Sequence, residues 1–299
     1  MTTTSSQTSR AALLILIGMA TLGFSDNLVR FVTTDSSLWQ FHLIRSSLVL
    51  SALCLAAWFG AGAIWPRRPI NVLGRSIFQA GALLIYFGCI AIMPIGVVVA
   101  GLFTAPLFVL IIGVVFQSKR VGLIRVAAAA VGFIGAVLVI DPDPEALDLI
   151  SFLPVFAGLL YAIGAIATRA WCEGEETLTL TFWFFALLLV FGVIGVLVLP
   201  TDGVAGSAGF PLRGWMPVTG AMLGWYAALA IGALIGIASI FRAYQIGEAG
   251  TVAIFEYTLL VFASFWAWVL WGEGVPVQGL IGMALIAAAG AVIALRDDA

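Results

Sequence analysis

Charged residues, histidine and cysteine are scarce in this chain. Only 9% of its 299 residues are Asp, Glu, Lys or Arg, and His42 is its single histidine. No GxSxG, P-loop or HExxH motif is present, and no group of residues has metal-ligand spacing. We therefore expect a protein that is not an enzyme, with no catalytic residues, no metal site, no cofactor and no ATPase of its own.

The three cysteines, Cys54, Cys89 and Cys172, stand alone without CxxC or Cys/His spacing, so they predict neither a disulfide framework nor a metal site. The net charge of −2 indicates neither an acidic nor a basic partner. We accordingly expect no nucleic-acid partner. A bilayer and a small-molecule substrate are the partners that remain, with protons as a candidate and a monomer as the expected state.

Apolar residues dominate instead. At 63% hydrophobic, a chain of this length cannot bury its apolar surface in a soluble fold. Charges, prolines and glycine clusters divide it into ten segments, each near the ~20 residues that cross a bilayer as a helix. We predict an all-α, multi-pass membrane protein with spans at residues 11–31, 37–59, 73–92, 95–116, 122–140, 149–170, 178–199, 218–243, 248–271 and 276–295.

The distribution of Lys and Arg predicts the orientation. With a cytoplasmic N-terminus, ten of these residues fall on the inner side and two on the outer side, while Arg45 lies within a span. This bias favours an even number of spans, N-in and C-in, in the cytoplasmic (inner) membrane. The inner residues are Arg10, Arg67, Arg68, Arg75, Lys119, Arg120, Arg125, Arg169, Arg242 and Arg296; the outer ones are Arg30 and Arg213.

The two halves resemble each other. Gly135–Ile140 reads GAVLVI and Gly290–Leu295 reads GAVIAL, each at the end of a span. A duplicated block of five spans enters the membrane from opposite faces in its two copies, which gives an inverted repeat. We predict repeats at residues 1–145 and 146–299, with a shared site at the bilayer midplane.

Glu256 is the leading candidate for a functional residue. It is the one carboxylate well inside the apolar stretch 247–273, where an ionised side chain persists only if it faces protein, a partner or a water-filled path. The alternative is a carboxylate that only bonds to neighbouring helices. Tyr257 beside it is a candidate for substrate contact or for simple packing.

A second group of polar residues is expected near the outer ends of the first two spans, where Asp26 lies at a depth similar to that of His42 and Arg45. This group is a candidate substrate site, and the alternatives are a structural ion pair and an outer gate. Glu256 and Arg45 differ in depth by roughly 7 Å, at 1.5 Å per residue. A zwitterion spans that separation with its ammonium toward Glu256 and its carboxylate toward Arg45.

Aromatic and helix-breaking residues complete the set of candidates. Tyr86, Tyr161 and Trp183 are predicted either to line an aromatic cavity or to pack between helices. Pro106 removes a backbone hydrogen bond within the fourth span and kinks it, and Thr104 supplies a replacement bond or contacts substrate.

Several short motifs resemble the drug/metabolite transporter superfamily, in its ten-span form built from two EamA repeats. They are Phe41–Arg45 (FHLIR), Thr104–Pro106 (TAP) and Trp271–Glu273 (WGE), followed by a small-residue span that ends GAVIAL. The first copy has Gln117-Ser118-Lys119 where the family often has Gly-Glu, and the second copy has no arginine that matches Arg45. The resemblance implies a fold of ten spans and a small-molecule substrate.

The expected function is secondary transport by alternating access. The zwitterion geometry, with the resemblance to exporters of the YddG type, favours export of amino acids, including aromatic and neutral ones. The alternatives are transport of another small metabolite or a drug, such as S-adenosylmethionine, and a membrane scaffold that moves no solute.

Overall fold

A computed structural model describes residues 5–33, 35–90, 93, 95–117, 122–143, 145, 149–201 and 209–297. Within these ranges the chain is helical and has no strand. The helices are α1 (Ser5–Leu28), α2 (Arg30–Thr33), α3 (Leu38–Trp58), α4 (Pro69–Ile90), α5 (Ile95–Leu102), α6 (Ala105–Gln117), α7 (Leu123–Ile140), η2 (Leu149–Ser151), α8 (Phe152–Ala170), α9 (Thr177–Val198), α10 (Gly220–Ile246), α11 (Ala249–Phe255), α12 (Thr258–Trp271) and α13 (Val277–Asp297).

The ten predicted spans are confirmed. Ten segments of the described chain are long and apolar enough to cross a bilayer, and each matches one predicted segment, from Gln7–Thr33 to Val277–Ala294. The fourth and ninth spans are each divided in two, into α5 and α6 and into α11 and α12. The division into repeats at 145/146 stays a prediction, and Ala146 lies outside the described residues.

Local sequence signals set several helix ends. The Ser37 hydroxyl accepts a hydrogen bond from the backbone N–H of Gln40 at 3.1 Å at the start of α3. Thr219 does the same for Met222 at the start of α10, at 3.3 Å. Such N-caps satisfy backbone donors that have no partner within the helix. Gly272 ends α12 with φ of 66°, a left-handed conformation that favours glycine.

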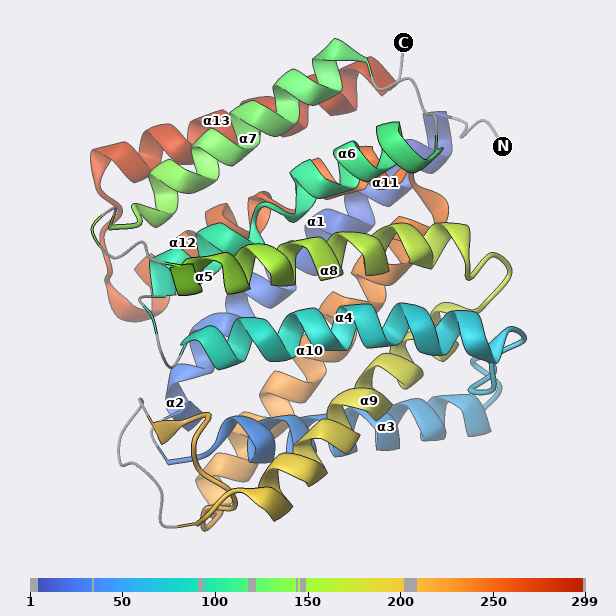
Figure 1. Ribbon diagram of the computed structural model, residues 1–299, viewed down its shortest axis with the longest axis vertical. Coiled ribbons are helices and arrows are strands. Elements are labelled where there is room, and N and C mark those ends of the chain that lie inside the picture. Colours follow the sequence, from blue (N-terminus) through green and yellow to red (C-terminus); the bar gives the residue numbers. More distant parts are fainter. Residues whose placement is uncertain are drawn as a thin grey trace.

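The helices pack in pairs that join the two halves of the chain. Extensive contacts join α1 to α10, α4 to α8, α3 to α9 and α7 to α13. In Figure 1 the α3/α9 pair lies at one edge of the bundle and the α7/α13 pair at the opposite edge, with the other spans between them. The first span of one half thus contacts the third span of the other half, in both directions. The repeat, its inversion and the N-in orientation stay predictions.

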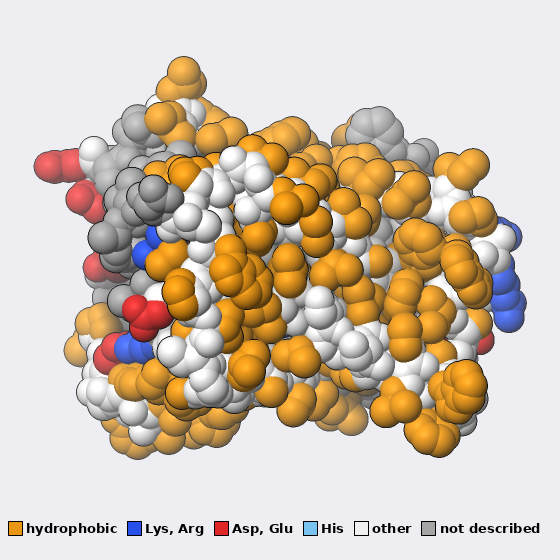
Figure 2. Space-filling model, turned by 90° about the horizontal axis from the view of Figure 1, so that it is seen from below, with side chains coloured by type: hydrophobic (Ala, Val, Ile, Leu, Met, Phe, Trp, Pro, Cys, Tyr) orange, Lys and Arg blue, Asp and Glu red, His pale blue; other side chains and the backbone are white. Residues whose placement is uncertain are grey.

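The surface has the pattern of a membrane protein. In Figure 2 hydrophobic side chains cover the middle of the visible face, and charged side chains gather toward its two ends. Figure 1 shows the first turns of α1 and the last turns of α13 at the same end of the bundle, as an even number of spans requires. A multi-pass integral membrane protein follows from these features.

Small residues allow the closest helix contacts at some positions and not at others. A Cβ at Gly232 would meet the Ser25 side chain at 2.6 Å, and one at Gly282 would meet the backbone oxygen of Gly135 at 2.5 Å. By contrast, nothing lies within 4 Å of a Cβ at Gly224. Glycine therefore lets α10 approach α1 closely and α13 approach α7 closely.

Candidate functional site

A central cavity lies between the two halves of the chain. Its volume is about 150 Å³. Eight spans contribute to its wall, and the side chains are mostly apolar and aromatic, with Asp26, Arg45 and Glu256 as the charged ones. The other lining residues are Met19, Leu22, Leu83, Tyr86, Phe87, Leu102, Phe103, Ala105, Pro106, Tyr161, Phe184, Phe185, Ala233, Ile237, Ile240 and Leu259.

The two divided spans bring their breaks to this cavity. The fourth span breaks at Phe103 and Thr104, between α5 and α6, and the ninth breaks at Glu256 and Tyr257, between α11 and α12. Pro106 stands in the first turn of α6, where its missing N–H costs least. The Thr104 hydroxyl donates to the backbone oxygen of Gly101 at 2.6 Å, so it supplies a hydrogen bond to the backbone at the break between α5 and α6. Discontinuous helices at membrane depth are typical of transporter binding sites.

Glu256 is buried at the second of these breaks and is only 7% exposed. Its Oε1 accepts a hydrogen bond from the Tyr161 hydroxyl at 2.7 Å. Tyr161 belongs to α8, the first span of the second half, and both residues line the cavity. The carboxylate therefore faces the interior of the bundle, and the hydrogen bond from Tyr161 helps to hold it there.

Asp26 is the more accessible of the two acids. Its side chain is exposed, although α1 turns it away from the surface of the bundle. On that helix the exposed apolar residues Leu13, Ile17 and Phe24 mark the outer face, whereas Asp26 shares its face with Met19 and Leu22, which line the cavity. At 100° per residue Asp26 lies about opposite Ile17. The exposure of Asp26 is therefore exposure to the cavity, which is open at this depth.

Arg45 and His42 lie together on α3 at the other side of the cavity. Nη2 of Arg45 is 3.4 Å from Nδ1 of His42, and the guanidinium lies 4.3 Å from the centre of the Phe41 ring. Within the described chain, Asp26 and Arg45 form no ion pair at 4 Å or less, but both face the cavity. His42 is fully buried and does not line the cavity wall. Asp26 and Arg45 therefore face the same cavity without forming an ion pair, and His42 lies behind Arg45 and outside the cavity wall.

The predicted aromatic residues separate into two groups. Tyr86 and Tyr161 line the cavity. Tyr257 is fully buried and packs against Gly132 and Phe103, outside the wall. Trp183 lies away from the cavity as well, because its indole N–H donates to the backbone oxygen of Ile64 at 3.2 Å in the loop that joins α3 to α4. Its place is that of an anchor at the membrane surface.

One residue of the inner-side charge count lies buried within a helix. Arg75 was counted among the inner-side charges, but α4 begins at Pro69 and carries Arg75 into the helix, where it is fully buried. Gln79, one turn further along α4, is also buried. The start of the apolar run was placed at residue 73, beyond the first turn of α4, and this hid the depth of Arg75. A proline at the first turn of a helix was the available signal.

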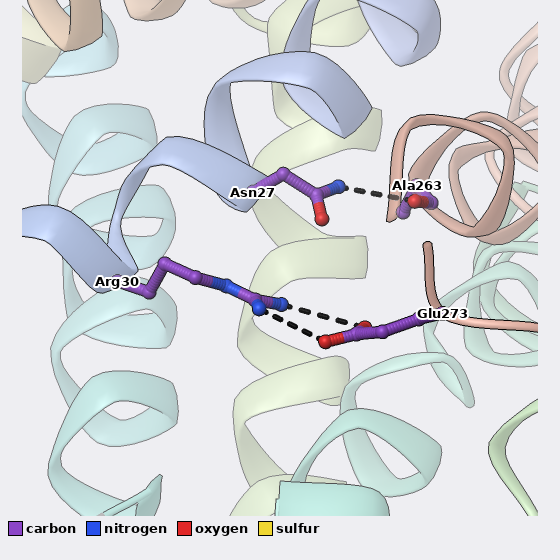
Figure 3. Close-up of polar contacts among 4 residues, drawn as sticks. All are labelled: Asn27, Arg30, Ala263 and Glu273. Atoms are coloured by element: carbon purple, nitrogen blue, oxygen red, sulfur yellow. Dashed lines mark hydrogen bonds and ion pairs between the residues drawn. The ribbon is translucent and has the colours of Figure 1, made fainter. Parts of the chain in front are cut away.

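At the other end of the bundle, α1 and α2 contact α12 and the loop that follows it. The Asn27 side chain donates to the backbone oxygen of Ala263 at 3.0 Å, and Arg30 forms an ion pair with Glu273 at 2.9 Å (Figure 3). The Arg30 guanidinium also lies 4.4 Å from the centre of the Trp271 ring. The hydrogen bond from Arg30 lowers the pKa of the Glu273 carboxyl below its usual value of 4.5. Both charges are about half exposed, so this contact is a surface clasp.

Three relatives have functional names that bear on this site. The chain is 27% identical over 270 residues to a riboflavin transporter of Rhizobium johnstonii, covering 90% of this chain and 82% of the relative. It is 24% identical over 231 residues to a pseudopaline exporter of Pseudomonas aeruginosa, covering 77% and 76%. It is 22% identical over 252 residues to an S-adenosylmethionine uptake transporter of Rickettsia bellii, covering 82% and 79%.

The fold has a counterpart among solved structures. A crystal structure superposes with a TM-score of 0.75 at 18% identity, over 98% of this chain and 99% of the other, and this likeness concerns the fold alone. No family model matches the sequence. The relatives are named transporters and not enzymes, and together with ten apolar helices they indicate a membrane transporter of small metabolites.

Proposed function

We propose that this protein is a secondary transporter that moves an aromatic small metabolite through the central cavity by alternating access. The observation that carries the proposal is one cavity, lined by both halves of the chain, into which Glu256, Arg45 and Asp26 all face. Intramembrane charges that converge on one space between two half-bundles are typical of a substrate site. A scaffold that moves no solute would have no use for them.

The lining favours a flat, aromatic substrate. Tyr86, Phe87, Phe103, Tyr161 and Phe185 supply aromatic faces and edges around the cavity. Riboflavin and S-adenosylmethionine, the compounds named for two of the relatives, both contain a planar heterocycle. An aromatic amino acid fits the same description. The proposed class is therefore an aromatic metabolite, of which amino acids are one kind.

The charges favour a substrate with polar groups of both signs. Glu256 lies on α11/α12 and Arg45 on α3, so they approach the cavity from different halves. A zwitterion places its ammonium at Glu256 and its carboxylate at Arg45 and so compensates both buried charges. Export of aromatic and neutral amino acids fits this arrangement. S-adenosylmethionine, which carries the same amino-acid group, fits it equally.

The cavity must enlarge to hold such a molecule. Ligand pockets are commonly about 300–1,000 Å³, and this one is about 150 Å³. The two breaks at Thr104 and Glu256 provide points at which α5/α6 and α11/α12 can bend. We therefore place substrate binding in a more open conformation of the same site.

The test is counterflow in proteoliposomes with labelled phenylalanine, riboflavin and S-adenosylmethionine, each with and without a pH gradient. We expect flux of at least one compound, and loss of that flux in Glu256→Gln and in Arg45→Ala, because each removes one of the charges that face the substrate. Glu145→Gln and Arg68→Ala, exposed charges far from the cavity, are the matched controls and should keep wild-type flux.

Two results would refute the proposal. One is wild-type protein that is folded and inserted but gives no counterflow with any of the three compounds. The other is wild-type flux in both cavity variants. If flux differs with and without a pH gradient, transport is coupled to protons. If flux is the same in both conditions, the protein is a uniporter or an exchanger.

A further inference from the structure

A line of polar side chains runs along α4 and α8 from the central cavity toward the end of the bundle where α8 ends. On α4 the face that carries Tyr86 and Leu83 at the cavity continues through Gln79 to Arg75, at spacings of three and four residues. On α8 the face of Tyr161 continues to Thr168, seven residues on. The two helices pack directly against each other, so these side chains meet between the halves of the chain.

Arg75 is held in a fixed orientation within this line. Its Nε donates to the Thr168 hydroxyl at 2.8 Å, and its Nη1 donates to the backbone oxygen of Leu180 at 3.3 Å. The guanidinium also lies 3.6 Å from the centre of the Phe241 ring. Thr168 in turn donates to the backbone oxygen of Gly164 at 2.8 Å. Contacts from α8, α9 and α10 thus hold a planar cation in one plane.

The remaining donors of this group have no partner. Nη2 of Arg75 and Nε2 of Gln79 are buried without a hydrogen bond, and both side chains are at least 97% buried. No carboxylate in the described part of the chain lies within 4 Å of the Arg75 guanidinium. A buried cation normally has a charged partner, because desolvation penalises an unpaired charge. The Arg75 cation and the unpaired donors Nη2 of Arg75 and Nε2 of Gln79 therefore lie one helical turn apart on α4. Together they can bind an anionic group.

This group lies between two hollow regions. Tyr161 lines the central cavity, and Thr168, which holds Arg75, lines a second cavity of about 700 Å³ formed by the ends of α8 and α10 with Cys172, Glu175 and Gln245. Arg75 itself lines neither cavity. It belongs to the packed layer that separates them, and a solute that passes from one cavity to the other has to cross this layer.

We propose that Arg75 and Gln79 form a carboxylate-binding station on the transport path, separate from the pair Arg45 and Glu256. A carboxylate accepts from Nη2 of Arg75 and from Nε2 of Gln79 when α4 and α8 separate, while Leu180 on α9 and Phe241 on α10 keep the guanidinium in place. The closed layer seals the path with these donors unpaired. An arriving carboxylate stabilises the opened layer, because it satisfies them. This inference rests on the proposed transport function.

The experiment uses purified full-length protein, with phenylacetate as the probe and phenylacetamide as its uncharged counterpart. Melting temperature is measured with each compound for wild type, Arg75→Met, Gln79→Leu and Arg213→Met. We expect phenylacetate, and not phenylacetamide, to raise the wild-type melting temperature. The shift should fall in Arg75→Met and in Gln79→Leu, and persist in Arg213→Met, a buried arginine that lines neither cavity.

The ligand-free proteins give a second readout. Arg75→Met removes an unpaired buried charge and keeps an unbranched, flexible side chain, so its melting temperature should equal or exceed that of wild type. If Arg75→Met does not fold, Gln79→Leu still decides, because it leaves the charge and removes one free donor. Equal shifts in wild type and both α4 variants overturn the inference, as does no wild-type shift.

Counterflow separates this inference from the proposed function. A folded Arg75→Met variant with wild-type flux of a carboxylate-bearing compound overturns the station and leaves the transporter standing. Wild-type protein with a phenylacetate-specific shift but no counterflow of any compound keeps the station as a binding site and refutes transport.

Discussion

The hydrogen bond between Tyr161 and Glu256 offers a direct measure of how the site is held. The Tyr161 hydroxyl donates to Oε1 of Glu256 at 2.7 Å in a largely buried setting. A hydrogen bond contributes about 0.5–1.5 kcal/mol between neutral groups and about 1.5–3 kcal/mol to a charged group. The larger cost arises when one partner is removed and the other remains buried and unsatisfied.

A double-mutant cycle exploits this asymmetry. Tyr161→Phe leaves the Glu256 carboxyl without its tyrosine, and Glu256→Met leaves the hydroxyl without its acceptor, so each should lower the free energy of unfolding. The double variant leaves neither group unsatisfied. We expect its loss of stability to be smaller than the sum of the single losses by about 1–3 kcal/mol.

The assay is equilibrium unfolding in mixed micelles of detergent and SDS, followed by tryptophan fluorescence. A coupling above about 1.5 kcal/mol indicates that the carboxyl is ionised in the folded state. Tyr86→Phe combined with Glu256→Met is the matched control, since Tyr86 lines the same cavity without a bond to Glu256, and should be additive within about 0.5 kcal/mol. A Tyr161–Glu256 coupling no larger than that of the control would refute the hydrogen bond.

Two further predictions concern helix contacts. Arg30→Ala should slightly reduce stability at neutral pH, because it removes the ion pair with Glu273. Arg30 lowers the pKa of Glu273 in the folded protein, so the ion pair contributes its full stability above pH 4.5, the usual pKa of the carboxyl. That stability is lost as the pH falls through the lowered pKa of the folded state. Thermal unfolding of wild type and Arg30→Ala from pH 7 into acid measures it. Gly132→Ala should cost about 1–3 kcal/mol, because the new Cβ would meet the Tyr257 ring at 2.6 Å; SDS unfolding measures it.

Each has its own check. A stability difference between wild type and Arg30→Ala that stays constant from neutral to strongly acidic pH contradicts the role of the Glu273 charge. Gly224→Ala is the control for the glycine variant, since its Cβ meets nothing within 4 Å and should be neutral. A Gly132→Ala variant as stable as Gly224→Ala contradicts the close contact at the break in the ninth span.

Hydropathy and charge were sufficient for the architecture. All ten spans were predictable, because an apolar run of about 20 residues satisfies its backbone hydrogen bonds in lipid only as a helix. The rarity of charge inside these runs also made Glu256, Arg45 and Asp26 recognisable as candidates, and all three line the cavity. These features depend on one segment at a time, so they can be read without knowing which helices are neighbours.

Side-chain neighbours were decided by the packing of distant segments. Tyr161 could be a packing residue or a cavity residue until α8 was placed beside the break that carries Glu256. The sequence leaves open whether Trp183 faces the cavity. The structure shows that its indole N–H contacts the loop at Ile64 instead. The charge count places Arg75 on the inner side of the membrane, and only the structure shows that α4 begins at Pro69 and carries Arg75 against Thr168.

The physical reason is that the same apolar helix can pack in many rotations about its axis. Hydropathy fixes how deep a residue lies, whereas the rotation depends on where small residues of one helix meet large ones of another, as Gly132 meets Tyr257 and Gly164 meets Gln79. Such contacts join segments far apart in the sequence. The sequence by itself therefore determined the spans and the depth of their charges, and only the tertiary structure decided which of those charges share a cavity.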